Sequence, residues 1–367
     1  MRGPGSPIAG QRGHGGELKP LTSIRGVAVI WVVLHHLTLY YRYPRMGPVS
    51  LFFFTGSVGV DIFFVLSGFI LTLVHRNLSP AGLKNFALRR IFRIYPLHLT
   101  VLATLALLCL FPRMRALWGA DWRDLPAVAL LVQPFFLDHA AWNGPTWSAG
   151  IEMSCYLAFP ILLFAARRLP TAAVICLLPL TAYAEYRVQL LYQGTWFGLP
   201  SFLRGLGAFG FGMNLGLIPQ RFNSPKLHVA AELLAGAILL GSCILRDTEI
   251  IPLAAGVMIW ILASGDGPVA QALSIKPLVF IGAISFSIYL VHLPIADLFN
   301  LAWPIIPHPP LDVNFLRRES LYFVVVLTVS SITYRFIEEP ARRFVSGRRA
   351  SGRNEIEAMV PEGAQDI

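Results

Sequence analysis

Two ionisable residues stand eleven positions apart inside an apolar stretch near the start of the chain. The stretch SIRGVAVIWVVLHHLTLYY, residues 23–41, holds Arg25, His35 and His36. At about 100° per residue, Arg25 and His36 fall within about 20° of three full helical turns and lie about 16 Å apart, whereas His35 points about 80° away from Arg25. Ionisable groups inside membrane helices usually face a wet cavity or a partner, so this pair indicates a functional stripe. The alternative is that Arg25 anchors the helix at the membrane surface and the histidines are packed core residues.

A second group of cations opens another apolar run. The string RRIFRIYP, residues 89–96, begins with Arg89 and places Arg90 and Arg93 at i, i+3 on one helical face. Two guanidiniums at a helix start beside a membrane predict a clamp for phosphate groups. Positive charges that orient a cytoplasmic loop and contact lipid headgroups explain the same pattern, so both interpretations stay open.

A carboxylate and a polar stripe lie in two further apolar runs. Glu152 lies within WSAGIEMSCYLAFP, where it needs a buried base as its partner. The string ISFSIYLVH places three polar residues within about 60° of one another on a helix: Ser285, Tyr289 and His292. Alternatives remain for both features, namely an arginine and glutamate pair that only holds helices together, and ordinary hydrogen bonds between helices.

The elements that position these residues are predicted to be membrane helices. The 367-residue chain is 55% hydrophobic and only 14% charged, which is typical of a polytopic membrane protein. Its net charge of +10 resides in short loops rather than on one polar face, which disfavours nucleic-acid binding. Apolar runs long enough to cross a hydrocarbon core of about 30 Å predict ten spans. They lie at about 24–41, 57–75, 94–112, 148–166, 170–186, 201–218, 228–245, 249–264, 278–299 and 320–337.

The expected fold is therefore an all-α integral membrane protein with about ten transmembrane helices. The shorter apolar piece LPAVALLVQPFF, residues 125–136, predicts one short re-entrant or interfacial helix. The basic loop at 75–93 has no acidic residue, so the positive-inside rule places it and both termini in the cytoplasm. Residues 1–20 and 346–367 are expected to be disordered tails around one transmembrane domain at 21–345. The four cysteines show no CxxC pair or metal-type spacing, so no metal site is expected.

The strings occur in an order that resembles acyltransferase family 3, the integral-membrane O-acyltransferases that use acyl-CoA and decorate bacterial surface sugars, lipids and some antibiotics. The resemblance covers about 20–345. It comprises LTSIRGVAVIWVVLHH, VGVDIFFVLSGFIL, RRIFRIYPLH, PTWSAGIEMSCYLAFP, IGAISFSIYLVHLPI and the closing YRFIEEPARR. The glutamate string departs from the family pattern at Gly150 and Met153, where bulkier or acidic residues are common.

The resemblance implies a set of roles for the residues. His36 would act as general base or transient acyl carrier, and Glu152 would orient it or another catalytic cation. Arg25 would bind the CoA phosphates or stabilise the oxyanion of the thioester carbonyl, together with the arginines of the basic string. Those arginines are Arg89, Arg90 and Arg93. The acceptor cavity would be lined by Ser285, Tyr289, His292 and Trp147. No tightly bound cofactor is expected, since acetyl-CoA or another acyl-CoA serves as donor substrate.

The same resemblance implies a bacterial inner-membrane protein that acylates a hydroxyl of a cell-surface glycan, an exopolysaccharide or a lipo-oligosaccharide. The expected partners are acyl-CoA, a glycan or lipid-linked glycan, and membrane lipids. Some relatives carry a fused extracytoplasmic esterase-like domain, which is not expected in this chain. The chain is therefore expected either to use its acceptor directly or to hand the acyl group to a separate extracytoplasmic acyl-handling protein. The acceptor could instead be a lipid or a secondary metabolite. A polytopic transporter is the rival from another class, although the chain shows no inverted repeat.

Overall fold

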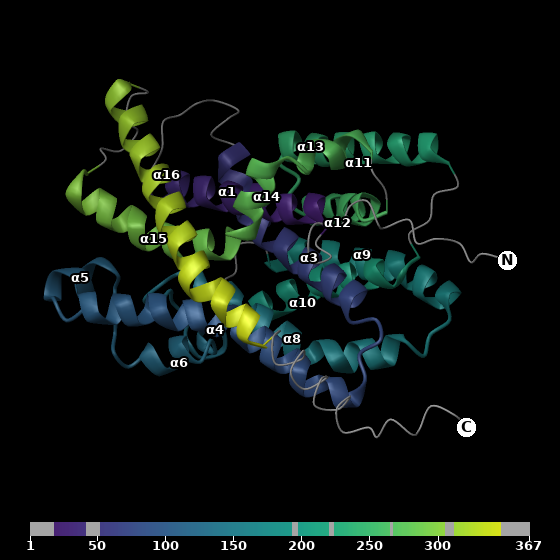
Figure 1. Ribbon diagram of the computed structural model, residues 1–367, viewed down its shortest axis with the longest axis horizontal. Helices are drawn as coiled ribbons and strands as arrows, with labels where there is room; N and C mark the ends of the chain where they lie inside the picture. Colours follow the sequence, from purple (N-terminus) through teal and green to yellow (C-terminus); the bar gives the residue numbers. More distant parts are fainter. Residues whose placement is uncertain are drawn as a thin grey trace, which may run out of the picture.

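The computed structural model describes residues 18–41, 52–192, 197–219, 224–264, 267–304 and 312–345. Throughout these ranges the regular structure is helical, without a strand, and the helices form one bundle (Figure 1). The all-α prediction is confirmed, and it follows from the need of apolar segments in lipid to satisfy their backbone hydrogen bonds internally. The predicted disordered tails lie almost wholly outside the described residues.

Ten helices overlap the ten predicted spans. They are α1 (Lys19–Tyr41), α3 (Gly59–Val74), α4 (Leu83–Leu108), α8 (Thr146–Ala166), α9 (Thr171–Tyr192), α10 (Gly198–Leu217), α11 (Pro225–Leu245), α12 (Ile251–Leu262), α15 (Ser285–Ala302) and α16 (Val313–Thr333). Within the described ranges, eight helical segments are long and apolar enough to cross a membrane. The glycine-rich α10 and the 12-residue α12 do not belong to that set. The chain is therefore a multi-pass membrane protein, with eight spans supported by length and composition.

The start of α4 corrects the expectation that the basic string opens a helix. This helix begins at Leu83, eleven residues before the predicted span at 94–112, so Arg90 and Arg93 lie about two and three turns inside it. Hydropathy counts each arginine against a position in lipid, so it places the start of the span after the basic string. The backbone hydrogen bonds of a helix do not depend on side-chain polarity, so the helix itself can start earlier. The helix can include these arginines because both side chains face an interior cavity.

Two predicted single helices are interrupted. The span at 278–299 is divided at Ile284 into α14 (Lys276–Ala283) and α15, close to the point where Gly282 packs on α1. The predicted helix at 125–136 is two short helices, α6 (Leu125–Ala129) and α7 (Gln133–Phe136), because Leu131 has a φ of 59° and Pro134 has no N–H to donate to the carbonyl of Leu130 in a continuous helix. Hydropathy alone does not reveal either interruption.

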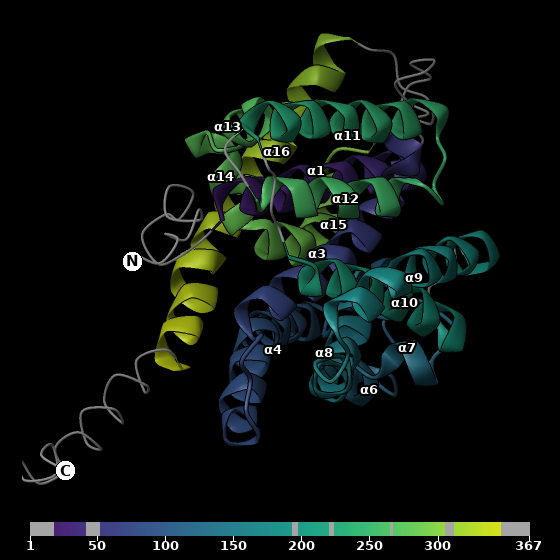
Figure 2. The same cartoon turned by 90° about the vertical axis from the view of Figure 1, so that its right-hand side faces the viewer.

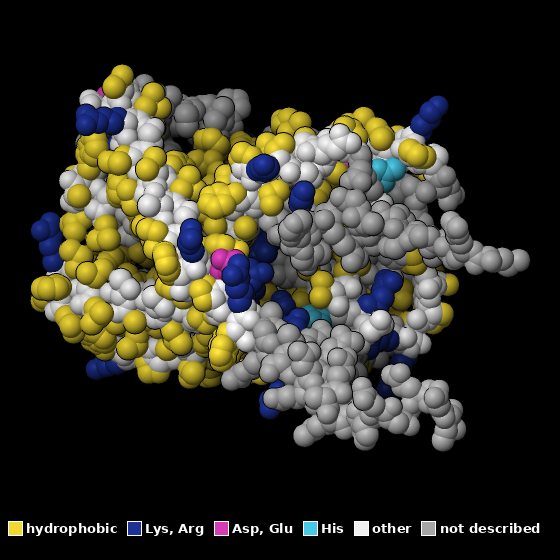
Figure 3. Space-filling model, viewed as in Figure 1, with side chains coloured by type: hydrophobic (Ala, Val, Ile, Leu, Met, Phe, Trp, Pro, Cys, Tyr) yellow, Lys and Arg dark blue, Asp and Glu magenta, His cyan; other side chains and the backbone are white. Residues whose placement is uncertain are grey.

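α1 lies inside the bundle. In both views α1 and α12 lie between α11 on one side and α3 on the other, with α8, α9 and α10 beyond α3 (Figure 1, Figure 2). α14 and α15 pack directly on α1, and α16 crosses the bundle diagonally toward α4 (Figure 1). Apolar side chains cover much of the face seen in Figure 3, as expected for a surface in contact with lipid.

Glycines allow α3 and α10 to approach each other closely. A Cβ atom added at Gly212 would lie 1.9 Å from the carbonyl oxygen of Val65, and one added at Gly68 would lie 2.0 Å from that of Phe209. Small residues at helix contacts are how backbones approach within membranes, where no hydrophobic force drives helices together. This contact fixes α3 against α10 and thereby positions the cavity residues that α3 carries.

We expect Gly212→Ala to destabilise the bundle by about 1–3 kcal/mol, because the added methyl group must displace the backbone of α3. Gly210→Ala is the matched control on the same helix, since a Cβ atom there meets nothing within 4 Å. It should be neutral or stabilise by about 0.5–1 kcal/mol through helix propensity. Thermal unfolding in detergent measures both variants, and equal midpoints would contradict the close approach.

Candidate active site

An interior cavity of about 110 Å³ brings together residues from five helices that are remote in the sequence. Three arginines and one carboxylate reach it: Arg25 from α1, Arg90 and Arg93 from α4, and Glu152 from α8. Its polar lining is completed by Ser67, Ser148, Tyr156, Ser285 and Tyr289. Six of the ten predicted site residues, from α1, α4, α8 and α15, therefore meet at one place.

Arg93 is held by a carboxylate that the sequence analysis did not select. Its Nη1 donates to Oε1 of Glu338 at 3.1 Å, and Ser287 Oγ donates to the other carboxylate oxygen at 3.1 Å. The Glu338 side chain is fully buried, and Arg342 adds a longer contact of 3.8 Å. Glu338 ends a π-helical turn, Tyr334–Glu338, and such turns are frequent at functional sites. The signal was present in the closing string YRFIEEPARR, which follows the last apolar run.

Glu152 lies with the cations of the cavity. One of its carboxylate oxygens accepts hydrogen bonds from Ser67 Oγ at 2.7 Å and from the hydroxyl of Tyr156. Arg90 lies over the Tyr156 ring, 5.5 Å from its centre, and Nε of Arg90 is buried without a partner among the described residues. Arg90 thus keeps a donor that a bound ligand can use.

His36 is paired with His292. Nδ1 of His36 lies 3.0 Å from Nε2 of His292, which comes from α15 and is fully buried. Neither ring is among the residues that line the cavity. Tyr289 connects the two places, since it lines the cavity and its ring centre lies 5.9 Å from that of His292. The partner found for His36 is therefore a second imidazole, whereas Glu152 lies with the arginines.

Two other predicted residues lie apart from the cavity lining. His35 packs against the segment before α3, with Nδ1 2.6 Å from the carbonyl oxygen of Phe54. Trp147 was predicted in the acceptor cavity, but its ring lies beside the guanidinium of Arg204, 5.4 Å from the ring centre.

Arg204 belongs to a second buried ion pair that the sequence analysis did not single out. Its Nε and Nη2 donate to the two carboxylate oxygens of Asp61 at 2.8 and 3.3 Å, and both side chains are at most 2% exposed. The pair joins α3 to α10. Asp61 stands in the string VGVDIFFVLSGFIL, where a carboxylate within so apolar a run signals a buried partner.

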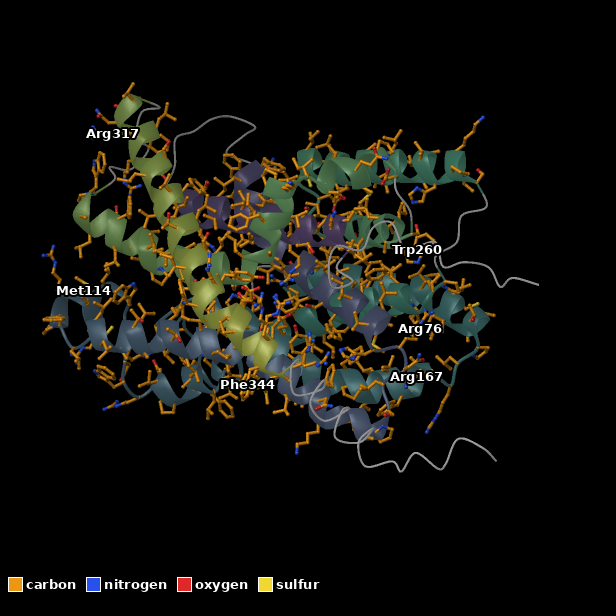
Figure 4. The ribbon with its side chains drawn as sticks, viewed as in Figure 1. Arg76, Met114, Arg167, Trp260, Arg317 and Phe344 are labelled. Carbon is orange, nitrogen blue, oxygen red and sulfur yellow. The ribbon has the colours of Figure 1, made fainter. Side chains whose placement is uncertain are left out.

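Arg89, the first arginine of the basic string, is not among the residues that line the cavity. Its charge acts on His75, the residue after α3, and burial together with the Arg90 and Arg89 guanidiniums lowers the pKa of His75 to about 4. Arg76 and Arg167 lie side by side, and Arg167 donates to the carbonyl oxygen of Arg76 (Figure 4). Arg167 donates to the carbonyl oxygen of His75 at 3.1 Å, and Arg76 donates to that of Leu217 at the end of α10 at 3.0 Å.

The charges of the site favour an anionic ligand. Three guanidiniums line the cavity against Glu152, and Glu338 contacts Arg93 from behind, which leaves an excess of one positive charge. Guanidiniums bind phosphate and stabilise a developing oxyanion, and a neutral imidazole can transfer a proton. In the part of the chain that the structure describes, no group of three His, Cys, Asp or Glu residues could hold a metal ion.

Comparison with known proteins gives matches over nearly the whole chain. The profile of the family described as acyltransferase domain matches residues 21–335. The chain is 30% identical over 306 residues to acyltransferase MdmB of Streptomyces mycarofaciens, covering 75% of this chain and 78% of that protein. It is 26% identical to the putative peptidoglycan O-acetyltransferase YrhL of Bacillus subtilis and 23% identical to the peptidoglycan O-acetyltransferase OatA of Listeria monocytogenes. These matches cover 90% and 88% of this chain, which spans about half the length of the two relatives, 55% in each case. No solved structure matches significantly.

Proposed function

The chain belongs to acyltransferase family 3, and we propose that it is a membrane-bound O-acyltransferase that moves an acetyl group from acetyl-CoA to a hydroxyl of a cell-surface glycan. The observation that carries this proposal is the cavity in which Arg25, Arg90 and Arg93 meet Glu152, beside the bonded imidazoles of His36 and His292. The cations suit a phosphorylated donor, and the imidazoles suit removal of a hydroxyl proton.

The arginines are proposed to hold the donor. CoA carries several phosphate charges, and Arg90 offers a buried Nε that has no partner in the described part of the chain. Arg93 is fixed by Glu338 and cannot move far, so it suits a fixed contact to a phosphate or to the thioester oxygen. Arg25 is placed eleven residues before His36 on α1, so the donor's thioester is proposed to extend from the arginines toward the imidazoles.

The transfer step is proposed to use His36 twice. As the acceptor oxygen attacks the thioester carbonyl, its proton moves to His36, and negative charge develops on the carbonyl oxygen. When the carbon–sulfur bond breaks, the CoA sulfur takes the same proton from His36. The products are the ester and CoA thiol, and the enzyme returns to its starting state.

The glycan acceptor is supported by the relatives' names. YrhL and OatA are named as peptidoglycan O-acetyltransferases, while MdmB is named only as an acyltransferase. The outer side of the bundle would admit a glycan or a lipid-linked glycan, and a lipid or secondary-metabolite hydroxyl is the alternative within the same reaction. A transporter would require neither the arginine cavity near a base nor a thioester.

A transfer assay tests the proposal. Purified protein in lipid vesicles is given acetyl-CoA labelled in the acetyl group, with peptidoglycan fragments as the acceptor probe. We expect label in an alkali-labile ester and one CoA thiol released for each ester formed. Absence of saturable acetyl-CoA binding would contradict the donor assignment, and thiol release without an ester on the fragments would contradict the glycan acceptor.

We expect Arg90→Gln to weaken acetyl-CoA binding by about tenfold, because it removes a charged donor to phosphate while Gln preserves most of the packing on Tyr156. Arg89→Gln is the matched control, since this neighbouring side chain does not line the cavity and its replacement should change the dissociation constant little. Acetyl-pantetheine, which lacks the nucleotide phosphates, should bind both variants as it binds the parent protein. Equal effects of the two substitutions would argue against a specific contact by Arg90.

A further inference from the structure

The hydrogen bonds of His292 determine which of its nitrogens carries the proton. Its Nδ1 lies 2.7 Å from the carbonyl oxygen of Tyr289 and 3.2 Å from that of Ile288. Carbonyl oxygens only accept, so Nδ1 must carry the hydrogen. The ring is fully buried among membrane helices and its bonded neighbours carry no negative charge, so the neutral form is favoured. A neutral imidazole has one N–H, which leaves Nε2 of His292 with the lone pair.

The same reasoning passes to His36. Nε2 of His292 accepts a hydrogen bond at 3.0 Å, and the atom facing it is Nδ1 of His36. We therefore assign Nδ1 of His36 as the donor, and we assign the ring's backbone hydrogen bond to Val32, one turn earlier on α1, to the same N–H. This assignment puts the lone pair of the His36 ring on Nε2. Two successive hydrogen bonds, from His292 to the carbonyl of Tyr289 and from His36 to His292, thus assign a tautomer to His36.

From this geometry we infer that His292 is a positioning residue for His36, and that Nε2 of His36 is the atom that takes the acceptor's proton. The inference rests on the proposed function. It also replaces the expected role of His292 as a cavity-lining residue, because the cavity is lined by Tyr289 one turn away. The rings that face His36 are His292 from α15 and His35 from its own helix.

A neutral partner has an advantage in this setting. When Nε2 of His36 takes a proton, both nitrogens carry hydrogen and the bond to His292 becomes charge-assisted, which stabilises the imidazolium. A carboxylate in the same place would do this too, but it would leave a buried negative charge between turnovers. His292 orients the base and supports its charged form without that cost.

The turn that carries His292 is itself held in place. Pro294 has no N–H, so the carbonyl of Leu290 lacks its helical donor, and Nδ2 of Asn143 supplies one at 2.8 Å. The hydroxyl of Tyr322 donates to the carbonyl oxygen of His292 at 3.1 Å. Contacts from two other segments therefore fix the backbone of α15 where it presents the imidazole to α1.

Two substitutions at His292 test the inference. His292→Gln keeps a side-chain oxygen that can accept from Nδ1 of His36, whereas His292→Phe fills the space without an acceptor. We expect the Phe variant to lose about 10- to 100-fold in kcat with an unchanged KM for acetyl-CoA, the loss typical of removing a residue that orients a reactive one. The Gln variant should recover most of that loss. A role in packing alone predicts the opposite order, since Phe preserves the ring.

The tests separate this inference from the proposed function. If His36→Ala retained activity, the base assignment itself would fail. If His36 is essential but the Phe variant matches the parent in kcat, or the Gln variant is no better than the Phe variant, the positioning role of His292 fails alone. Nitrogen-15 chemical shifts of histidine-labelled parent protein read the tautomer independently of any variant. An unprotonated Nδ1 on neutral His36 would overturn the inference.

Discussion

Replacing His36 by alanine should lower acetyl transfer by about 10²- to 10⁴-fold, the range typical of losing a general base. A sugar hydroxyl is a weak nucleophile, and we assign the role of base to the imidazole on α1 that is paired with His292. Acetyl-CoA binding should persist, because the arginines that we assign to the phosphates lie at the cavity and are not touched. Labelled transfer in lipid vesicles and equilibrium binding of acetyl-CoA measure the two quantities separately.

The neighbouring histidine provides a matched control. His35→Ala removes the same side chain one position earlier on the same helix, but this ring contacts the carbonyl of Phe54 and supports the packing of α1. It should reduce thermal stability by about 1 kcal/mol while preserving transfer per folded molecule. The catalytic role of His36 would be contradicted if His36→Ala kept most of its transfer activity, or if His35→Ala and His36→Ala lost the same amount of activity.

The positions of Arg25 and His36 show which part of the site can be predicted from spacing along a single helix. Helical periodicity predicts that Arg25 and His36 share a face, because it depends only on their spacing along one helix. It does not predict that this one helical face contacts two different sites, with Arg25 lining the cavity and His36 bonded to His292. That division depends on where α15 packs, 256 residues further along the chain.

The partners of the arginines were harder to predict. Arg93 and Glu338 are 245 residues apart in the sequence. Their contact depends on a π-helical turn, which the pattern of apolar residues does not predict. The all-α fold follows directly from the composition and the apolar runs. The early start of α4 does not, because a hydropathy pattern treats each arginine as a charge in lipid, while the fold turns Arg90 and Arg93 inward.

Removing one member of the pair formed by Asp61 and Arg204 should have the largest effect on stability. Arg204→Met leaves the Asp61 carboxylate buried between α3 and α10 without its two guanidinium bonds. Breaking a buried pair in this way costs about 3–5 kcal/mol, because the remaining charge is uncompensated. We expect a large fall in the unfolding midpoint in mixed micelles, together with reduced yield of folded protein.

A double variant separates the stability that the ion pair itself contributes from the cost of leaving one buried charge without its partner. The double variant Asp61→Leu with Arg204→Met removes both charges and should recover most of the lost stability, since apolar replacements of buried pairs are often neutral. The surface pair of Arg343 and Glu339, at 2.7 Å with Arg343 mostly exposed, is the control, and Arg343→Met should change stability by at most about 1 kcal/mol. If the double variant were as unstable as Arg204→Met, the two charges would not be coupled. In that case the close packing of α3 on α10 would depend on the arginine's contact with Trp147 rather than on its charge.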